Sequence, residues 1–177
     1  MNNQVNLVVK EKKKRKIGIK TFVFLCFLLL CSWSIFTDAK ERTLASVPSD
    51  GNIKFLVKLE GIDMLSNNSV GDEWFFTAKV NDVFIENGDK IEILMSKDDT
   101  IKIHTSATEN DTISDIGYKN ESINITDLDL TQKNTYGIRV WVEENKGKYA
   151  GNRAIWKFNF AIERKIEFSD ILKNMFK

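Results

Sequence analysis

The chain has almost none of the residues that many catalytic and metal-binding sites use. Its two cysteines, Cys26 and Cys31, both lie in an N-terminal apolar segment, so the 138 residues from Lys40 onward contain none. For that part of the chain, this excludes a disulfide, a thiol nucleophile and a cysteine-ligated zinc site. His104 is the only histidine, which excludes a site built from several histidines.

Recognisable catalytic motifs are also missing. The sequence has no glycine-rich nucleotide-binding pattern and no G-x-S-x-G nucleophile motif. His104 lies in an alternating run, on the opposite face from Ile101 and Ile103, where a lone histidine is more often a surface or packing residue than a base. Carboxylate pairs for glycoside hydrolysis need only meet in space, but the sequence marks no particular pair. We therefore expect no enzyme activity and no bound nucleotide.

The first 39 residues have the order of a secretory signal. A basic head, Lys10–Lys16, precedes Thr21–Phe36, a 16-residue run without charge, and Ala39 offers a small residue for cleavage. The run is shorter than the ~20 apolar residues that span a bilayer, which favours a cleaved signal peptide over a retained signal anchor. A lipoprotein acylated on Cys31 is a third alternative, although the bulky Leu30 departs from such a signal.

Each alternative predicts that the remaining chain works outside the cytosol. It would be secreted, or held at the cell surface if the N-terminal segment is not cleaved. The long lysine-rich head and the abundance of Lys, Asn and Ile resemble proteins of Gram-positive bacteria with low GC content.

Charge separates the two parts of the chain. The first 39 residues carry seven basic and two acidic side chains, which leaves 19 basic and 23 acidic side chains from Lys40 onward. A mildly acidic exported domain is a poor nucleic-acid binder, so we expect no nucleic-acid partner.

From Ile53 onward apolar residues recur with a period of two, which predicts β-strands. Clusters of Gly, Asn, Asp and Ser separate the runs, as in strands joined by turns. No long helical period intervenes, so the sequence predicts an all-β fold, an antiparallel eight-stranded β-sandwich. The alternating runs are Phe55–Leu59, Trp74–Val80, a short run at Val83–Ile85, Ile91–Met95, Ile101–Ile103, Ile123–Ile125, Tyr136–Val142 and Ala154–Ile162.

These patterns divide the chain into four parts. Residues 1–39 are the signal peptide or signal anchor, 40–52 a linker around Pro48, 53–164 the β-sandwich, and 165–177 a short C-terminal helical tail. In the tail, Ser169 and Asp170 can cap a helix that carries Ile171, Leu172, Met175 and Phe176 on one side. Such a short helix is expected to pack on the edge of the sandwich, or else to contact a membrane or partner.

Two segments together resemble C2 domains, the calcium- and lipid-binding β-sandwiches. The first runs from Leu56 to Phe76: an alternating strand, a polar loop at Ser66–Gly71, then Asp72 before an aromatic residue and a new strand. The second joins the strand at Ile101–Thr105, acids at Glu109 and Asp111, the turn Asp115-Ile116-Gly117 and the run at Ile123. The resemblance covers about Ile53 to Glu163 and implies the same sandwich fold.

The resemblance also implies a calcium site. The family binds calcium with aspartates from two loops at one end of the sandwich, and calcium requires six to eight oxygen ligands. Here Asp72 matches the family's aspartate before the aromatic residue, and Asn67 or Asn68 is a neutral ligand where the family has its first aspartate. The further candidate ligands are Glu109, Asp111 and Asp115 of the later loop, whose spacing differs from that of the family. The alternative is that these acids are solvated loop residues and turn formers, as in a C2-like fold without calcium.

A second candidate surface is the segment Asn145–Arg153, expected at the tip of a long hairpin. Its basic and aromatic side chains are Lys146, Lys148, Tyr149 and Arg153, separated by glycines. They could bind a phosphate-bearing polymer or an anionic headgroup. The alternative is a solvated tip whose lysines discourage edge pairing.

The sequence thus predicts an exported, non-enzymatic binding module. Its acidic loops, with calcium as the expected cofactor, would contact a membrane, an envelope polymer or a protein partner. The alternative is a metal-independent structural or interaction domain tethered at the cell surface.

Overall fold

The computed structural model describes residues 19–46, 48, 51–111 and 114–175. The chain divides into two compact units, Met1–Asp38 and Ala39–Lys177. In the first unit the described residues belong to helix α1, Ile19–Ala45, and most of its large apolar side chains from Phe24 to Ile35 are exposed. Of the helices in the described part of the chain, none is both long enough and apolar enough to cross a membrane.

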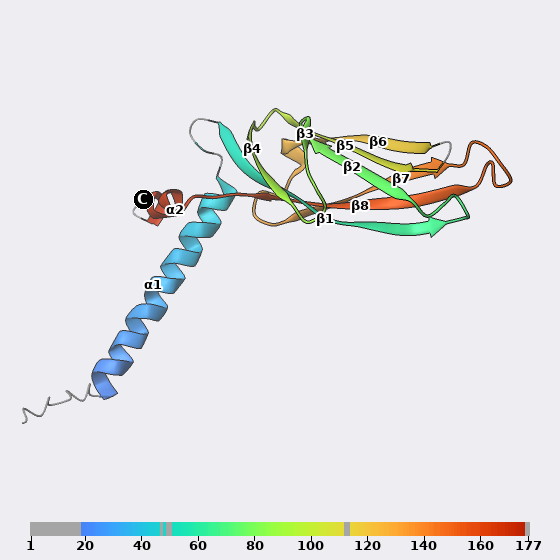
Figure 1. Ribbon diagram of the computed structural model, residues 1–177. Coiled ribbons are helices and arrows are strands. Elements are labelled where there is room, and N and C mark those ends of the chain that lie inside the picture. The colour runs from blue at the N-terminus through green and yellow to red at the C-terminus, as the bar shows by residue number, and fades with distance from the viewer. Residues whose placement is uncertain (1–18, 47, 49–50, 112–113, 176–177) are drawn as a thin grey trace, which may run out of the picture. The chain divides into compact units, whose positions relative to one another are not determined.

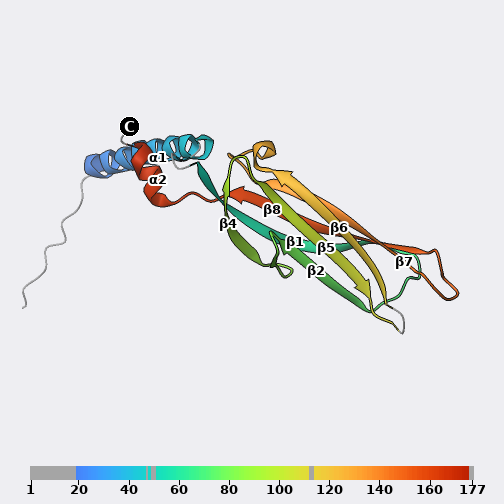
Figure 2. The same ribbon diagram turned by 90° about the horizontal axis from the view of Figure 1, so that it is seen from above.

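The second unit contains eight strands in two antiparallel sheets of four (Figures 1 and 2). Sheet A has the strand order β4-β1-β8-β7, and sheet B has the order β3-β2-β5-β6. The strands are β1 Asn52–Asn67, β2 Trp74–Val80, β3 Val83–Phe84, β4 Lys90–Ser96, β5 Thr100–Glu109, β6 Asp115–Asn124, β7 Asn134–Glu143 and β8 Arg153–Arg164. A 3-10 turn, η1 Ile125–Asp127, follows β6.

The core lies between the sheets because most of the strands alternate buried apolar residues with more exposed ones. In β1 the buried residues Ile53, Phe55, Val57 and Leu59 alternate with more exposed ones, and β8 does the same around Phe158. Each apolar side chain of this size contributes about 1.5–3 kcal/mol when fully buried. With no cysteine in this unit, this core must supply most of its stability.

One side of the sandwich is closed by β6 and β7. Gly117 of β6 lies so close to β7 that a Cβ atom there would overlap the carbonyl oxygen of Trp141. The other side ends in β4 and β3, the outer strands of the two sheets. Since β3 has only two residues, this second side is covered over only part of its length.

The expected all-β fold, eight antiparallel strands with a short C-terminal helix, is confirmed. Two details differ from expectation. Asp115-Ile116-Gly117, expected as a turn, begins β6 because Asp115 pairs with Glu109 across the β5–β6 hairpin. Helix α1 continues to Ala45, so the expected linker from residue 40 is helical in its first half.

The C-terminal helix α2, Phe168–Met175, carries Ile171 as its buried residue. Within the same unit, Asn174 of α2 donates a hydrogen bond to the Thr43 hydroxyl, 2.9 Å from Nδ2 to Oγ1. Arg164, the last residue of β8, donates from Nη1 to the carbonyl oxygens of Leu44 and Ser46. The end of α1 is therefore joined to the C-terminal part of the chain. Phe176 lies outside the described residues.

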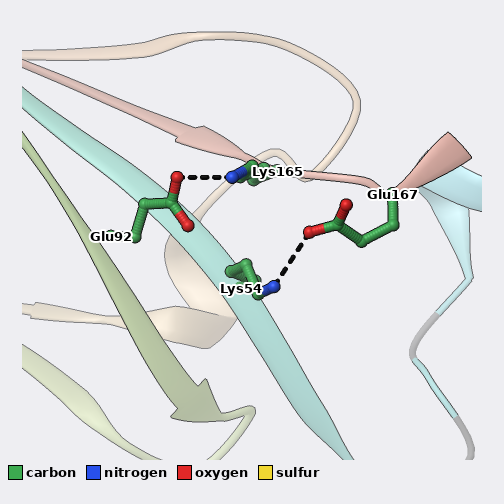
Figure 3. A network of polar contacts seen from close by, with 4 residues as sticks. All are labelled: Lys54, Glu92, Lys165 and Glu167. Carbon is green, nitrogen blue, oxygen red and sulfur yellow. Dashed lines mark hydrogen bonds and ion pairs between the residues drawn. The ribbon is translucent and has the colours of Figure 1, made fainter.

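Two ion pairs hold the segment between β8 and α2 against sheet A (Figure 3). Lys54 of β1 pairs with Glu167, 2.9 Å from Nζ to Oε1, and Lys165 pairs with Glu92 of β4. The Glu167 hydrogen bond and charge raise the pKa of Lys54, and Lys54 in turn lowers the pKa of Glu167. The side chains of both pairs are exposed to solvent, which screens their charges, so each pair contributes little to stability.

Candidate functional site

Three connections meet at one end of the sandwich, which we call the loop end. In sheet A, Asn67 at the end of β1 pairs with Ala154 at the start of β8. In sheet B, Glu109 pairs both with Trp74 and with Asp115. The β1–β2, β5–β6 and β7–β8 connections therefore all lie at this end (Figure 2). The two sequence segments expected to carry calcium ligands are thus brought to the same end.

The β1–β2 loop is held by Asn67. Its Oδ1 accepts a hydrogen bond from the Val70 amide at 3.0 Å, and its Nδ2 donates to the Gly71 carbonyl at 2.6 Å. The Trp74 indole N–H also donates to the Gly71 carbonyl, at 3.3 Å, and Val70 is buried in the core. Asn67, expected as a neutral calcium ligand, therefore already has a structural role in this loop.

Glu109 is the most unusual residue of the loop end. Only 2% of its surface is exposed, it packs against Gly71, and its Oε2 atom has no hydrogen-bond partner among the described residues. Burial raises the pKa of Glu109, and the nearby charge of Asp111 raises it further, while the backbone amides of Glu73 and Asp111 oppose the shift. A buried carboxylate with an unpartnered oxygen is costly unless it is protonated or a cation approaches.

Asp115 is also buried, but its partners are present. Its Oδ1 atom accepts hydrogen bonds from Asn145, at 2.6 Å from the side-chain Nδ2 and 3.3 Å from the backbone amide. These bonds tie the start of β6 to the base of the β7–β8 hairpin. Asp115, expected as a calcium ligand, thus fixes the position of the hairpin in this structure.

The structure adds Glu144 to this group of acids. Burial raises the pKa of Glu144, as do the charges of Asp115 and Asp111, so these three acids lie near one another. The sequence pattern did not indicate Glu144, because it belongs to the β7–β8 connection. Only the pairing of the strands brings it close to Asp111 and Asp115. We call Glu109, Asp111, Asp115 and Glu144 the acidic cluster.

Asp72, the fourth expected ligand, is exposed in the β1–β2 loop, next to Gly71 and Glu73. Among the described residues, no group of three or more His, Cys, Asp or Glu side chains is arranged to hold a metal ion. The donor types of the acidic cluster suit a hard cation such as calcium, and Glu109 offers a free oxygen. Calcium binding at this end remains a prediction.

The expected basic surface lies on the β7–β8 connection, at the same end. Lys146 and Lys148 are exposed, and Lys148 Nζ lies 5.2 Å from the centre of the Tyr149 ring. Arg153 is paired with Glu143 of β7, 2.7 Å from Nη2 to Oε2. An anionic ligand at this tip would therefore contact the two lysines and Tyr149, while Arg153 is engaged across the hairpin. The location at a hairpin tip is as expected; ligand binding there remains a prediction.

His104 lies on the outer face of β5. Its Nδ1 atom is 2.7 Å from the Asn120 Oδ1 atom, and its ring lies 6.3 Å from the Tyr118 ring, centre to centre. In the described part of the chain, no carboxylate or hydroxyl group forms a hydrogen bond with this ring. This arrangement matches the surface role expected for a lone strand histidine.

No protein-family model matches the chain, and a search of curated proteins found none that matches it.

Proposed function

We propose that the chain is an exported, non-enzymatic binding module that contacts its ligand through the loop end. One observation carries the proposal: Glu109 is buried with an unpartnered oxygen among further acids. Burying a charged carboxylate without full hydrogen bonding lowers the stability of the fold, and a bound cation or cationic ligand would remove this desolvation cost. The eight-stranded sandwich with acids from two connections at one end supports the C2-like interpretation of this module.

Calcium is the proposed cofactor. Its ligands would be Glu109 and Asp111, with Asp72 from the neighbouring loop and Asp115 as further candidates. Because no three of these carboxylates are grouped to hold a metal in the described structure, binding requires that loop side chains move together. Weak binding is sufficient outside a cell, where calcium modules work with dissociation constants of about 10⁻⁴–10⁻³ M.

A thermal melt of the full chain tests the calcium proposal. A mild detergent is needed because α1 exposes large apolar side chains, and the intrinsic tryptophan fluorescence reports unfolding. Calcium at ten times its dissociation constant would stabilise the fold by about 1.4 kcal/mol relative to chelator. Asp111→Asn should abolish this shift with little change in chelator. Asp98→Asn, an exposed acid in the β4–β5 turn at the opposite end, should keep the shift. A missing shift, or an equal shift in both variants, would contradict the proposal.

A metal-independent interaction domain is the second candidate. Its support is Asp115, whose oxygen already accepts two hydrogen bonds from Asn145 and needs no cation. In that case the acidic cluster would attract a cationic partner directly. Ligand binding that is equal in chelator and in calcium would favour this candidate.

The proposed ligand classes are an envelope polymer, a membrane surface or a protein, outside a Gram-positive cell. Vesicles with and without anionic lipid, and isolated cell-wall polymer, are direct probes when combined with chelator or calcium. Lys146→Glu with Lys148→Glu separates the two surfaces of the loop end: it should weaken binding to anionic vesicles and leave the calcium shift unchanged. Cell fractionation with N-terminal sequencing tests export and shows whether cleavage occurs after Ala39.

A further inference from the structure

The second half of β1 lies at an open edge of sheet A. On the side of β4, the last backbone hydrogen bonds join Leu59 to Gly88 and Asp89, at 2.8 and 3.1 Å. Beyond that point β1 continues through Glu60–Asn67 with β8 as its one neighbouring strand. In the described chain, the peptide groups of this segment that point away from β8 have no backbone partner. We call Glu60–Asn67 the open edge.

A second unpaired stretch lies in sheet B on the same side. β3 pairs with β2 only at Lys79 and Val80, so Trp74–Thr77 pair with β5 alone. The strands β4 and β3 form the side of the sandwich opposite to the closed β6–β7 side. Both unpaired stretches therefore face the same side, next to the loop end.

Apolar side chains lie between these two stretches. Phe76 and Trp74 of β2 contact Trp156 of β8, with ring centres 4.5 and 5.1 Å apart, and the Trp156 indole N–H has no hydrogen-bond partner among the described residues. Met64 pairs with Trp156 in the register and therefore shares its inward face, yet 47% of its surface is exposed. Leu65 of the open edge is 46% exposed.

The open edge has some, but not all, of the features that protect sheet edges from pairing. Proteins commonly use lysine, proline, bulges or very short edge strands for this purpose. Glu60–Asn67 has bulges between Leu59 and Gly61 and between Met64 and Ser66, but it contains no lysine and no proline. A stretch of this length remains competent to pair with an added strand.

Charge indicates what kind of strand would fit. From Glu60 to Ala78 the sequence has four acids and no lysine or arginine, and the acidic cluster lies at the same end. Glu60 pairs with Lys133 at 3.1 Å, and Asp63 accepts a hydrogen bond from Asn159 at 2.7 Å. Asp72 and Glu73 are exposed in the adjoining loop. This side therefore complements a cationic segment.

We propose that an extended, basic segment of a partner protein binds as an added strand along the open edge. Its backbone would pair with the free peptide groups of Glu60–Asn67, which is the recognition mode called β-augmentation. Alternate side chains would pack on Met64 and Phe76, and its cations would lie near Asp72 and Glu73. This proposal rests on the proposed function in that it takes the chain to be a binding module, and it names the class of partner.

A second copy of the chain is a poorer occupant on the same evidence. Pairing two open edges would bring the acids of both copies together, and like charges that face each other across an interface oppose association. The charge pattern thus favours a partner of opposite sign.

The test uses a fluorescein-labelled nonapeptide of alternating lysine and valine with the full chain in mild detergent. Fluorescence anisotropy measures its dissociation constant. The matched control peptide has the same residues but carries a methyl group on every internal peptide nitrogen, which keeps its charge and removes the backbone donors from both of its edges. We expect binding at least tenfold tighter for the unmodified peptide, and slower hydrogen exchange in residues 60–67 when it is bound.

Leu65→Lys places a positive charge on the open edge, and Leu94→Lys is its matched control. Leu94 is 63% exposed on β4, the edge strand that already covers the first half of β1. Leu65→Lys should weaken peptide binding at least tenfold, whereas Leu94→Lys should leave it nearly unchanged, with similar melting temperatures in both variants. Equal binding of the two peptides or of the two variants would overturn the proposal. The proposal would also be overturned if the chain forms a dimer that Leu65→Lys dissociates. In that case a second copy of the chain, not a basic partner segment, would bind the open edge.

The two proposals fail separately. A calcium shift that Asp111→Asn abolishes, combined with no preference for the unmodified peptide, would leave the loop-end function standing and overturn the open-edge proposal. In the converse case, the peptide binds and Leu65→Lys weakens that binding, while calcium gives no shift in melting temperature. That result would support the open-edge proposal and overturn the calcium part of the proposed function.

Discussion

Glu109 packs directly on Gly71, and a Cβ atom on Gly71 would overlap the Glu109 carboxyl group. The backbone of Gly71 also has a φ of +134°, a conformation that residues with a side chain rarely adopt. A single glycine therefore allows both the turn of the β1–β2 loop and the position of the buried acid. The packing joins the first loop to the end of β5.

Gly71→Ala should therefore destabilise the fold. Backbone strain alone costs about 1–3 kcal/mol, and the overlap with Glu109 adds to it. Gly61→Ala is the matched control, because a Cβ atom there meets no atom within 4 Å. Denaturant unfolding should show a clear loss for Gly71→Ala and a change within about 0.5 kcal/mol for Gly61→Ala. Similar losses of stability in both variants would show that neither the Gly71 backbone conformation nor its contact with Glu109 is specifically required for stability.

Glu109→Gln should stabilise the fold near neutral pH. Burial, and then the Asp111 charge, raises the pKa of Glu109 above its ordinary value of 4.5, so the folded chain holds this proton to higher pH than the unfolded chain. The stability from this proton is present below pH 4.5 and is lost as pH rises through the raised value. The melting temperature of Glu109→Gln should exceed that of the natural chain at pH 7, and the difference should shrink toward pH 4.5.

The control for this pH series is Glu86→Gln, an exposed residue in the β3–β4 connection. Its melting temperature should follow that of the natural chain across the series. A Glu109→Gln variant that is less stable at pH 7, in chelator, would show that the charged carboxylate is stabilised by contacts other than those described.

Asp115→Ala should be clearly destabilising, unlike a change at a solvated loop acid. It removes the buried carboxylate that accepts both Asn145 hydrogen bonds, and hydrogen bonds to a charged group contribute about 1.5–3 kcal/mol. Asp98→Ala, in an exposed turn, should change stability by no more than about 0.5 kcal/mol. Denaturant unfolding in chelator measures both. Equal losses of stability in Asp115→Ala and Asp98→Ala would show that Asp115 behaves as a solvated acid.

The sandwich could be predicted from the sequence because burial on one face of a strand imposes a period of two. Residues such as Phe158 and Val140 follow that period closely, and both are fully buried. Asp115-Ile116-Gly117 could not be placed in the same way. Ile116 is exposed and Gly117 faces β7, so this stretch of β6 lacks the apolar alternation that marks a strand.

The candidate site was predictable only in part. Asp72, Glu109 and Asp111 follow strands in the sequence, so a shared end could be expected from an antiparallel fold. The involvement of Glu144 and the contact of Gly71 with Glu109 depend on how strands of different sheets align, which no local pattern encodes. The open edge likewise follows from where β4 stops pairing, not from the residues of β1 themselves.

Arg164→Ala should loosen the end of α1 without unfolding the sandwich. Arg164 bonds to the carbonyl oxygens of Leu44 and Ser46, and its removal leaves the last turn of the helix without these donors. Burial lowers the pKa of Arg164 because desolvation disfavours its charged form. This desolvation offsets part of what the Arg164 hydrogen bonds contribute, so the melting temperature should change little. Hydrogen exchange should become faster in residues 43–46 and stay unchanged in β8.

Two further variants serve as controls for Arg164→Ala. Arg164→Lys should give an intermediate rate of exchange in residues 43–46, since a lysine donates hydrogen bonds without the planar fork of arginine. Lys157→Ala, on the same strand, should leave the exchange of residues 43–46 unchanged. Unchanged exchange in Arg164→Ala would mean that the other hydrogen bonds of this turn, such as Asn174 to Thr43 and Ser46 to Arg42, hold it without Arg164.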